Sequence, residues 1–147
     1  MDIKQNLIDL NAVQVNVSVN DWRDAIRVAA VPLITHRYIE PRYVETIIKN
    51  TEQDGPYYVL DEAPLAMPHA HPEDGVLKTG FSLVTLASPI SFEGSVPVDI
   101  VMMFGAINGE MHISEGLQAI LLLIEQGQKL AAIRKADSVA AVLNALG

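Results

Sequence analysis

The chain has 147 residues, of which 50% are hydrophobic and 19% are charged. This length and balance predict one folded domain over residues 1–147 and argue against a disordered chain. The formal net charge is −8 and no cluster of lysine or arginine stands out, so a basic protein is a more suitable partner than a nucleic acid. Because the chain contains no cysteine, its chemistry must use histidine, carboxylate or hydroxyl groups.

The N-terminal stretch MDIKQNLIDL lacks the basic segment and apolar run of a secretion signal. The longest strongly apolar run, AILLLI at residues 119–124, is too short to cross a bilayer. We therefore expect a cytoplasmic protein.

Valines at positions 13, 15, 17 and 19 alternate with polar residues, which predicts a half-buried first strand. Asn20 is the expected cap of the helix that follows, and Pro41 the expected start of a second helix. The apolar stripe of the first helix comprises Trp22, Ala25, Ile26, Ala29, Ala30 and Leu33, and that of the second comprises Val44, Ile47 and Ile48.

Three further segments read as strands: YYVL (57–60), FSLVTLA (81–87) and VDIVMMFGAI (98–107). The last is apolar almost throughout, which is typical of a strand covered on both faces, so we place residues 98–104 at the centre of the sheet. The C-terminal third is predicted to be helical, with one helix over 117–125 and another capped by Asp137 or Ser138. The expected fold is α/β, a single sheet flanked by helices on both faces.

His69 and His112 are the histidines best placed for chemistry. His69 follows Pro68, which stiffens the chain at a strand end or tight turn. His112 follows the predicted central strand and precedes a helix. Sites in α/β sheets gather beyond the carboxyl ends of strands, so the two could meet. The alternative is that each only caps or hydrogen-bonds a loop, as expected of His36 at the negative end of a helix dipole.

A zinc site is a second hypothesis. His69, His71 and His112, together with Glu73 or Asp74, could supply three nitrogens and one oxygen, the donor set of a zinc-dependent hydrolase. The spacing of His69 and His71 alone is weak support for it.

The stretch PLAMPHAHPEDGVLKTGFSLVTL, residues 64–86, resembles the signature of the enzyme IIA domains of the phosphotransferase system (PTS), fructose/mannitol superfamily, and is most similar to its ascorbate branch. The resemblance continues through EPRYVETI, GPYYVL, PVDIVM and HISEGLQAI. Its most specific element is the core formed by Leu65, Ala66, Met67, Pro68, His69 and Ala70. The resemblance implies a mixed sheet flanked by helices, in agreement with the periodicity.

The resemblance also implies a function. His69 matches the histidine that is phosphorylated by phospho-HPr, and His112 matches a second histidine that faces it. Relatives pass the phosphoryl group to a cysteine of a IIB component, which serves a membrane IIC component in sugar uptake, here of ascorbate; regulatory members bind other proteins instead. Mannitol-type members carry a glutamate and an arginine where this chain has Ala63 and Gln53, and the ascorbate branch often has arginine at the place of His71.

The phosphoryl group needs hydrogen-bond donors around it. We expect a carbonyl to hold the second ring nitrogen of His69, and backbone N–H groups at Ala70 and His71 to bind phosphoryl oxygens, with the Thr79 or Ser82 hydroxyl as weaker candidates. The chain has no Walker glycine loop, so ATP is not the expected donor and no cofactor is implied. The sequence leaves a homodimer open.

Overall fold

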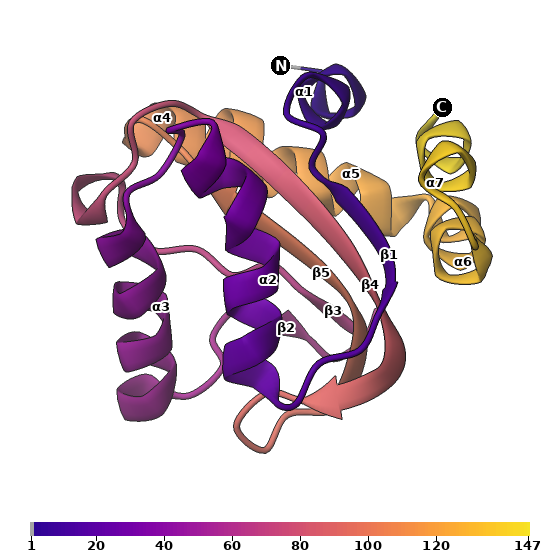
Figure 1. Cartoon of the computed structure of the whole chain (residues 1–147), viewed down its shortest axis with the longest axis horizontal. Coiled ribbons are helices and arrows are strands. Elements are labelled where there is room, and N and C mark those ends of the chain that lie inside the picture. The colour runs from indigo at the N-terminus through magenta and orange to yellow at the C-terminus, as the bar shows by residue number, and fades with distance from the viewer. Residues whose placement is uncertain (1) are drawn as a thin grey trace.

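The computed structural model describes residues 2–147, apart from the side chain of Ile113. Five strands form one mixed sheet in the order β1-β4-β5-β3-β2 (Figure 1). The pairs β1/β4 and β3/β5 are parallel, whereas β4/β5 and β2/β3 are antiparallel. The strands are β1 (Val13–Val17), β2 (Val59–Leu60), β3 (Leu65–Ala66), β4 (Gly80–Ser91) and β5 (Pro97–Gly105).

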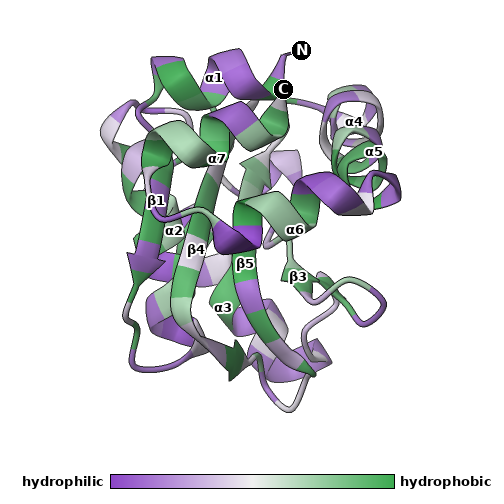
Figure 2. Cartoon of the chain, turned by 90° about the vertical axis from the view of Figure 1, so that its right-hand side faces the viewer, coloured by the Kyte–Doolittle hydropathy of each residue, from purple (hydrophilic) through white to green (hydrophobic). Residues whose placement is uncertain are grey.

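Helices cover both faces of this sheet, which confirms the predicted fold class. One face carries α2 and α3, and the other carries α5, α6 and α7 (Figures 1 and 2). The bounds of the longer helices are α1 (Ile3–Asp9), α2 (Trp22–Thr35), α3 (Pro41–Asp54), α5 (Gln118–Glu125), α6 (Gly127–Lys135) and α7 (Val139–Leu146). The shorter ones are the 3-10 helix η1 (Pro72–Asp74), α4 (Gly109–Met111) and the π-helix η2 (His112–Leu117).

The starts of the helices test the predicted caps. Pro41 is the first residue of α3 and Ser138 caps α7, as the sequence indicates. The prediction for α2 is wrong by one residue: Asp21 is the cap, and its carboxylate accepts the Asp24 N–H at 2.9 Å. Asp21 has the extended backbone that a cap requires directly before the first helical turn, while the Asn20 N–H donates to the Asp24 side chain at 3.0 Å.

The central position of β5 explains its composition. Residues 98–104 are buried except for Asp99, which is partly exposed. Helix α2 packs its predicted apolar stripe against the sheet, and every residue of that stripe is buried. Burial of each large aliphatic side chain contributes roughly 1.5–3 kcal/mol, so this sandwich provides a rigid base for the loops at its edge.

The two short strands, β2 and β3, differ most from the prediction. Of the segment YYVL only Val59 and Leu60 form a strand, and the unpredicted β3 lies beside β5 with Leu65 opposite Ile100. Since β3 and β5 run parallel, their carboxyl ends meet at one edge of the sheet. Within residues 2–147, none of the helices has both the length and the apolar character needed to cross a membrane.

Candidate active site

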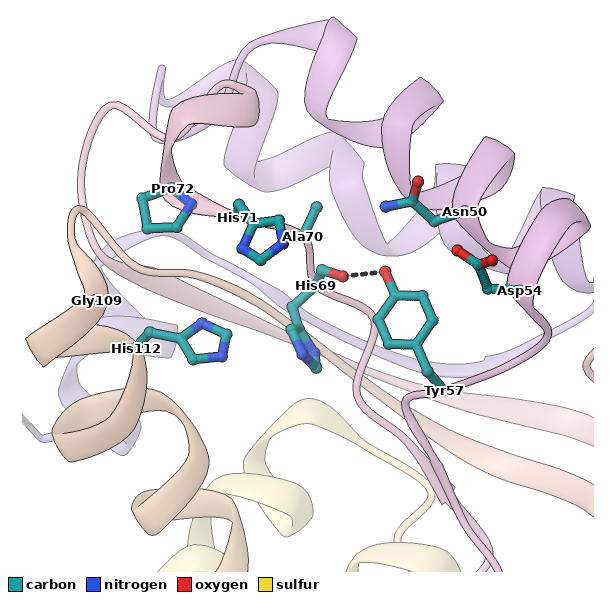
Figure 3. A pocket seen from close by; sticks show the side chains of 9 residues that line it. All are labelled: Asn50, Asp54, Tyr57, His69, Ala70, His71, Pro72, Gly109 and His112. Carbon is teal, nitrogen blue, oxygen red and sulfur yellow. Dashed lines mark hydrogen bonds between the residues drawn. The ribbon is translucent and has the colours of Figure 1, made fainter.

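The edge where β3 and β5 end holds a cavity of about 560 Å³. His69 comes three residues after the end of β3, and His112 begins η2 shortly after β5. Their ring centroids lie 5.0 Å apart, so the structure brings the two histidines together. The cavity is lined by Asn50, Asp54, Tyr57, His69, Ala70, His71, Pro72, Gly109 and His112 (Figure 3).

The imidazole of His69 is held in one orientation. Its Nδ1 lies 2.7 Å from the carbonyl oxygen of Met67, as expected of a carbonyl that fixes the tautomer. A carbonyl can only accept, so Nδ1 carries the proton and Nε2 keeps its lone pair. The ring also stacks on Phe104, with centroids 4.8 Å apart and planes 26° from parallel, and the ring of Tyr57 meets it edge-on.

Burial keeps both histidines neutral. Loss of solvent lowers the pKa of His69 below its usual 6.5, and nearby His112 and His71 lower it further, against an opposing effect of the Met67 carbonyl. The pKa of His112 is also lowered, first by burial and then by the neighbouring charge of His71. Near pH 7 the site therefore presents a neutral nucleophilic nitrogen facing a neutral second imidazole.

His112 owes its place to an unusual helix. Asn108 caps the segment, since its side chain accepts the Met111 N–H at 2.9 Å, and the π-helical turn then continues into α5. Single π-helical turns occur frequently at functional sites. Gly116 in this turn lies directly on the Phe104 ring, where a Cβ atom would overlap the aromatic carbons. The helix and the His69 imidazole thus both pack on one phenylalanine.

Comparison with known proteins shows which family the chain belongs to. Residues 6–147 match the family described as phosphoenolpyruvate-dependent sugar phosphotransferase system, EIIA 2. The chain belongs to this EIIA family. It is 39% identical over 145 residues to the ascorbate-specific PTS system EIIA component of Salmonella choleraesuis (strain SC-B67), covering 95% of this chain and 93% of that protein.

Similar proteins from other bacteria support the same assignment. The ascorbate-specific EIIA component of Escherichia coli (strain K12) is 35% identical over 147 residues, with 98% of this chain and 94% of that protein covered. The crystal structure of a PTS IIA protein (PtxA) from Streptococcus mutans superimposes with a TM-score of 0.92 at 31% identity, covering 99% of this chain and 93% of that one. As a member of the EIIA family, the chain is a phosphotransfer protein.

The hydrogen-bond donors expected for the EIIA site are mostly engaged elsewhere. The Ala70 N–H donates to the Tyr43 hydroxyl at 2.9 Å, and the His71 N–H donates to the Asp74 carboxylate at 3.0 Å. Neither backbone group is free for a phosphoryl oxygen, although the His71 side chain does line the cavity.

The two hydroxyl candidates also lie outside the cavity lining. Thr79 Oγ1 accepts the Ile107 N–H at 3.0 Å, and the buried Ser82 Oγ donates to the Ala29 carbonyl at 2.6 Å. Both hydroxyl oxygens bond backbone groups, and neither residue lines the cavity. His36 is the C-cap of α2, as predicted, and does not line the cavity.

The cavity differs in charge from a typical anion site. Among the described side chains that line it there is no lysine or arginine, and Asp54 adds a carboxylate. Ala63 and Gln53 do not line it either; helix α3 contributes Asn50 and Asp54 instead, four residues apart on one face. Binding of an anion therefore depends on neutral donors and on the histidines.

The histidine and carboxylate side chains do not form a zinc site in the described structure. Across residues 2–147, no group of three or more histidine, aspartate or glutamate side chains is arranged to hold a metal ion. His69 uses one ring nitrogen on Met67, and Asp74 uses a carboxylate oxygen on the His71 backbone. The ligand set proposed from sequence therefore does not converge.

Two tyrosines of the site were missed by the sequence analysis. Tyr57 donates its hydroxyl to the His69 carbonyl (Figure 3), and Tyr43 accepts the Ala70 N–H while donating to the Phe104 carbonyl at 2.9 Å. In the sequence they lie in helix- and strand-like segments, where a tyrosine is unremarkable. In the motif GPYYVL only the last two residues form a strand. Its first tyrosine, Tyr57, therefore lies outside the strand, where its side chain can serve the site.

Proposed function

We propose that this protein is the phosphocarrier of an ascorbate phosphotransferase system. In this proposal His69 Nε2 takes a phosphoryl group from phosphorylated HPr and delivers it to a cysteine of a IIB component. The observation that carries the proposal is the bond from His69 Nδ1 to the Met67 carbonyl, which leaves Nε2 as a neutral nucleophile at the edge of an open cavity. The ascorbate assignment is supported by relatives named for that substrate.

The phosphoryl group is transferred in two steps. The Nε2 lone pair attacks phosphorus, the N–P bond forms, and the bond from phosphorus to HPr breaks with its electron pair returning to HPr. A thiolate of IIB then attacks the same phosphorus, and the N–P electron pair returns to Nε2. Such a loose, in-line displacement asks the protein mainly for positioning and charge stabilisation.

His112 is the proposed charge stabiliser. Its ring lies 5.0 Å from that of His69, and burial lowers its pKa while no phosphoryl group is bound. A phosphoryl group brings about two negative charges, which raise the pKa of a neighbouring imidazole and favour its protonated form. His112 then binds phosphoryl oxygens as a cation and becomes neutral again after the group has left. The His71 side chain lines the same cavity and offers a further ring nitrogen to the phosphoryl group.

The acceptor must be another protein, because this chain has no cysteine. It must dock around His69, and the contact must be transient since the carrier has to return to HPr; encounters of this kind commonly bury less than about 1,200 Å². The IIB component serves a membrane IIC component in sugar uptake, so this chain contributes to transport through its partners.

A two-step transfer tests the proposal. The protein is charged with labelled phospho-HPr, HPr is removed, and ascorbate-type IIB is added either intact or with its cysteine replaced. We expect an acid-labile, alkali-stable label that leaves only in the presence of intact IIB and without any nucleotide. Label that stays on the protein with both forms of IIB would contradict the carrier role and favour a regulatory IIA protein.

A further inference from the structure

One peptide group next to the nucleophile is held at both of its ends by tyrosine hydroxyls. The carbonyl of the His69–Ala70 peptide accepts a hydrogen bond from Tyr57, and its N–H donates to Tyr43 at 2.9 Å. Tyr43 in turn donates to the carbonyl of Phe104 at 2.9 Å. The peptide is thereby tied to the central strand β5 and to the residue on whose ring the His69 imidazole stacks.

The peptides that precede His69 are held by backbone groups and by the His69 ring on the Met67 carbonyl. The Phe104 N–H donates to the Pro68 carbonyl at 3.3 Å, and the Met67 N–H donates to the Tyr58 carbonyl at 3.0 Å. The restraint after His69 is therefore the one that depends on the side chains of other residues. Of the two tyrosines, Tyr43 is fully buried, whereas Tyr57 is 45% exposed and lines the cavity.

We propose that Tyr57 is a positioning residue for phosphoryl transfer, which holds the His69–Ala70 peptide so that Nε2 stays in line for attack. This inference rests on the proposed function. Tyr57 acts on the nucleophile through the backbone carbonyl of His69, and its ring meets the imidazole edge-on with centroids 5.6 Å apart (Figure 3).

The hydroxyl of Tyr57 is suited to this task. Burial raises its pKa above the usual 10, so it keeps the proton that it donates to His69. Asn50 of α3 lines the same cavity as Tyr57.

Loss of this restraint affects the tautomer. The bond from Nδ1 to Met67 requires the His69 ring and the preceding carbonyl to keep their relative positions. Without the Tyr57 hydroxyl the His69 backbone can shift, the Nδ1 bond weakens, and part of the neutral imidazole takes the tautomer with its proton on Nε2. That tautomer has no lone pair at Nε2 and cannot attack from that nitrogen.

The test variant is Tyr57→Phe, which removes the hydroxyl and keeps the ring. Tyr58→Phe is the matched control, because the neighbouring hydroxyl bonds Thr51 at 2.9 Å and belongs to a residue that does not line the cavity. The single-turnover rate of charging by phospho-HPr and its half-saturating concentration are measured for both. The imidazole ¹⁵N shifts of His69 report the tautomer directly.

We expect Tyr57→Phe to lower the charging rate about tenfold, the scale of a small misplacement of a reacting atom, with the half-saturating concentration unchanged and an Nε2–H population visible by NMR. Tyr58→Phe should leave the rate and the tautomer as they are. A wild-type rate in Tyr57→Phe, or a slower rate with a raised half-saturating concentration and an unchanged tautomer, would overturn the positioning role. A wild-type protein that accepts no phosphoryl group on His69 would instead overturn the proposed function.

Discussion

The segments that carry His69 and His112 are built in opposite ways. His69 is fixed by the Met67 carbonyl on its ring, by stacking on Phe104 and by hydrogen bonds to the peptides on either side of it. The His112 ring is placed only by ring contacts and makes no side-chain hydrogen bond within the described part of the chain. It also sits on a π-helical turn, not on a strand end.

This difference matches the two tasks of a phosphocarrier. A nucleophile gains from being held in line before the reaction, because its ordering is then complete when the phosphoryl group arrives. A charge stabiliser must serve a site that is alternately empty and doubly charged, so it gains from a ring that can turn and change protonation. The following substitutions and measurements test this difference between the two histidines.

Replacement of the fixed histidine has the largest expected effect. His69→Ala removes the proposed acceptor nitrogen, so phosphorylation by phospho-HPr should fall to background. His36→Ala is the control, since His36 is exposed at the end of α2 and outside the cavity. Labelling with radioactive phosphate measures both. Equal labelling of His69→Ala and the wild type would place the acceptor elsewhere.

Removal of the adaptable histidine should slow transfer without abolishing it. His112→Ala deletes a charged donor, which typically costs on the order of 10²-fold in rate, while His69 remains as acceptor. Rapid-quench kinetics of charging measure the loss.

The pKa of His112 provides an independent test of its proposed role as charge stabiliser. NMR titration should find it below 6.5 in the uncharged protein and higher after phosphorylation. On acidification the uncharged protein should keep a neutral His69 to a pH below 6.5, since burial lowers that pKa as well, and charging should slow only below it. A His112 pKa that is the same in both forms would contradict the proposed stabilisation.

Gly116→Ala tests the contact that joins the two segments. The added methyl group would overlap the Phe104 ring, so the ring or the π-helical turn must move. Overpacking of this kind costs about 1–3 kcal/mol of unfolding free energy, and displacement of Phe104 should slow charging severalfold. Gly127→Ala is the control, because a Cβ there meets no atom within 4 Å. Chemical denaturation and charging rates that are equal in the two variants would disprove the close packing.

His71→Arg has the smallest expected effect. Arginine stays charged and can bind two phosphoryl oxygens, so it should preserve transfer or raise it by up to a few-fold in a cavity that no arginine or lysine lines. The same charging assay measures it. A strong loss would show that the His71 imidazole itself takes part.

The sequence predicts the frame of the fold better than the site. The continuous apolar run of β5 reflects burial on both faces of the strand, and the apolar stripe of α2 reflects burial on one face of the helix. Both are local patterns that can be read from neighbouring residues. Strand β3 has only two residues and owes its conformation to pairing with β5, which no local pattern reports. It is nevertheless the strand that delivers His69 to the edge of the sheet.

The supporting groups of the site could not be read from the chain. His69 itself is indicated by Pro68 and by the motif around it. The hydroxyls of Tyr43 and Tyr57 reach the His69–Ala70 peptide from separate segments, and Tyr43 occupies the expected donor at Ala70. The N–H of His71 is instead occupied locally, by the Asp74 carboxylate three residues on. Hydrogen bonding between distant segments depends on the assembled fold, so these partners appear only in three dimensions.

The central claim is that the Met67 carbonyl holds His69 Nδ1–H and thereby makes Nε2 the phosphoryl acceptor. The most direct test is NMR of the phosphorylated protein with ¹⁵N-labelled histidine, in which coupling to ³¹P identifies the bonded nitrogen. We expect the coupling at Nε2 of His69, with a protonated Nδ1 whose shift still reports a hydrogen bond. Phosphorus bonded to Nδ1 of His69, or to another residue, would contradict the account.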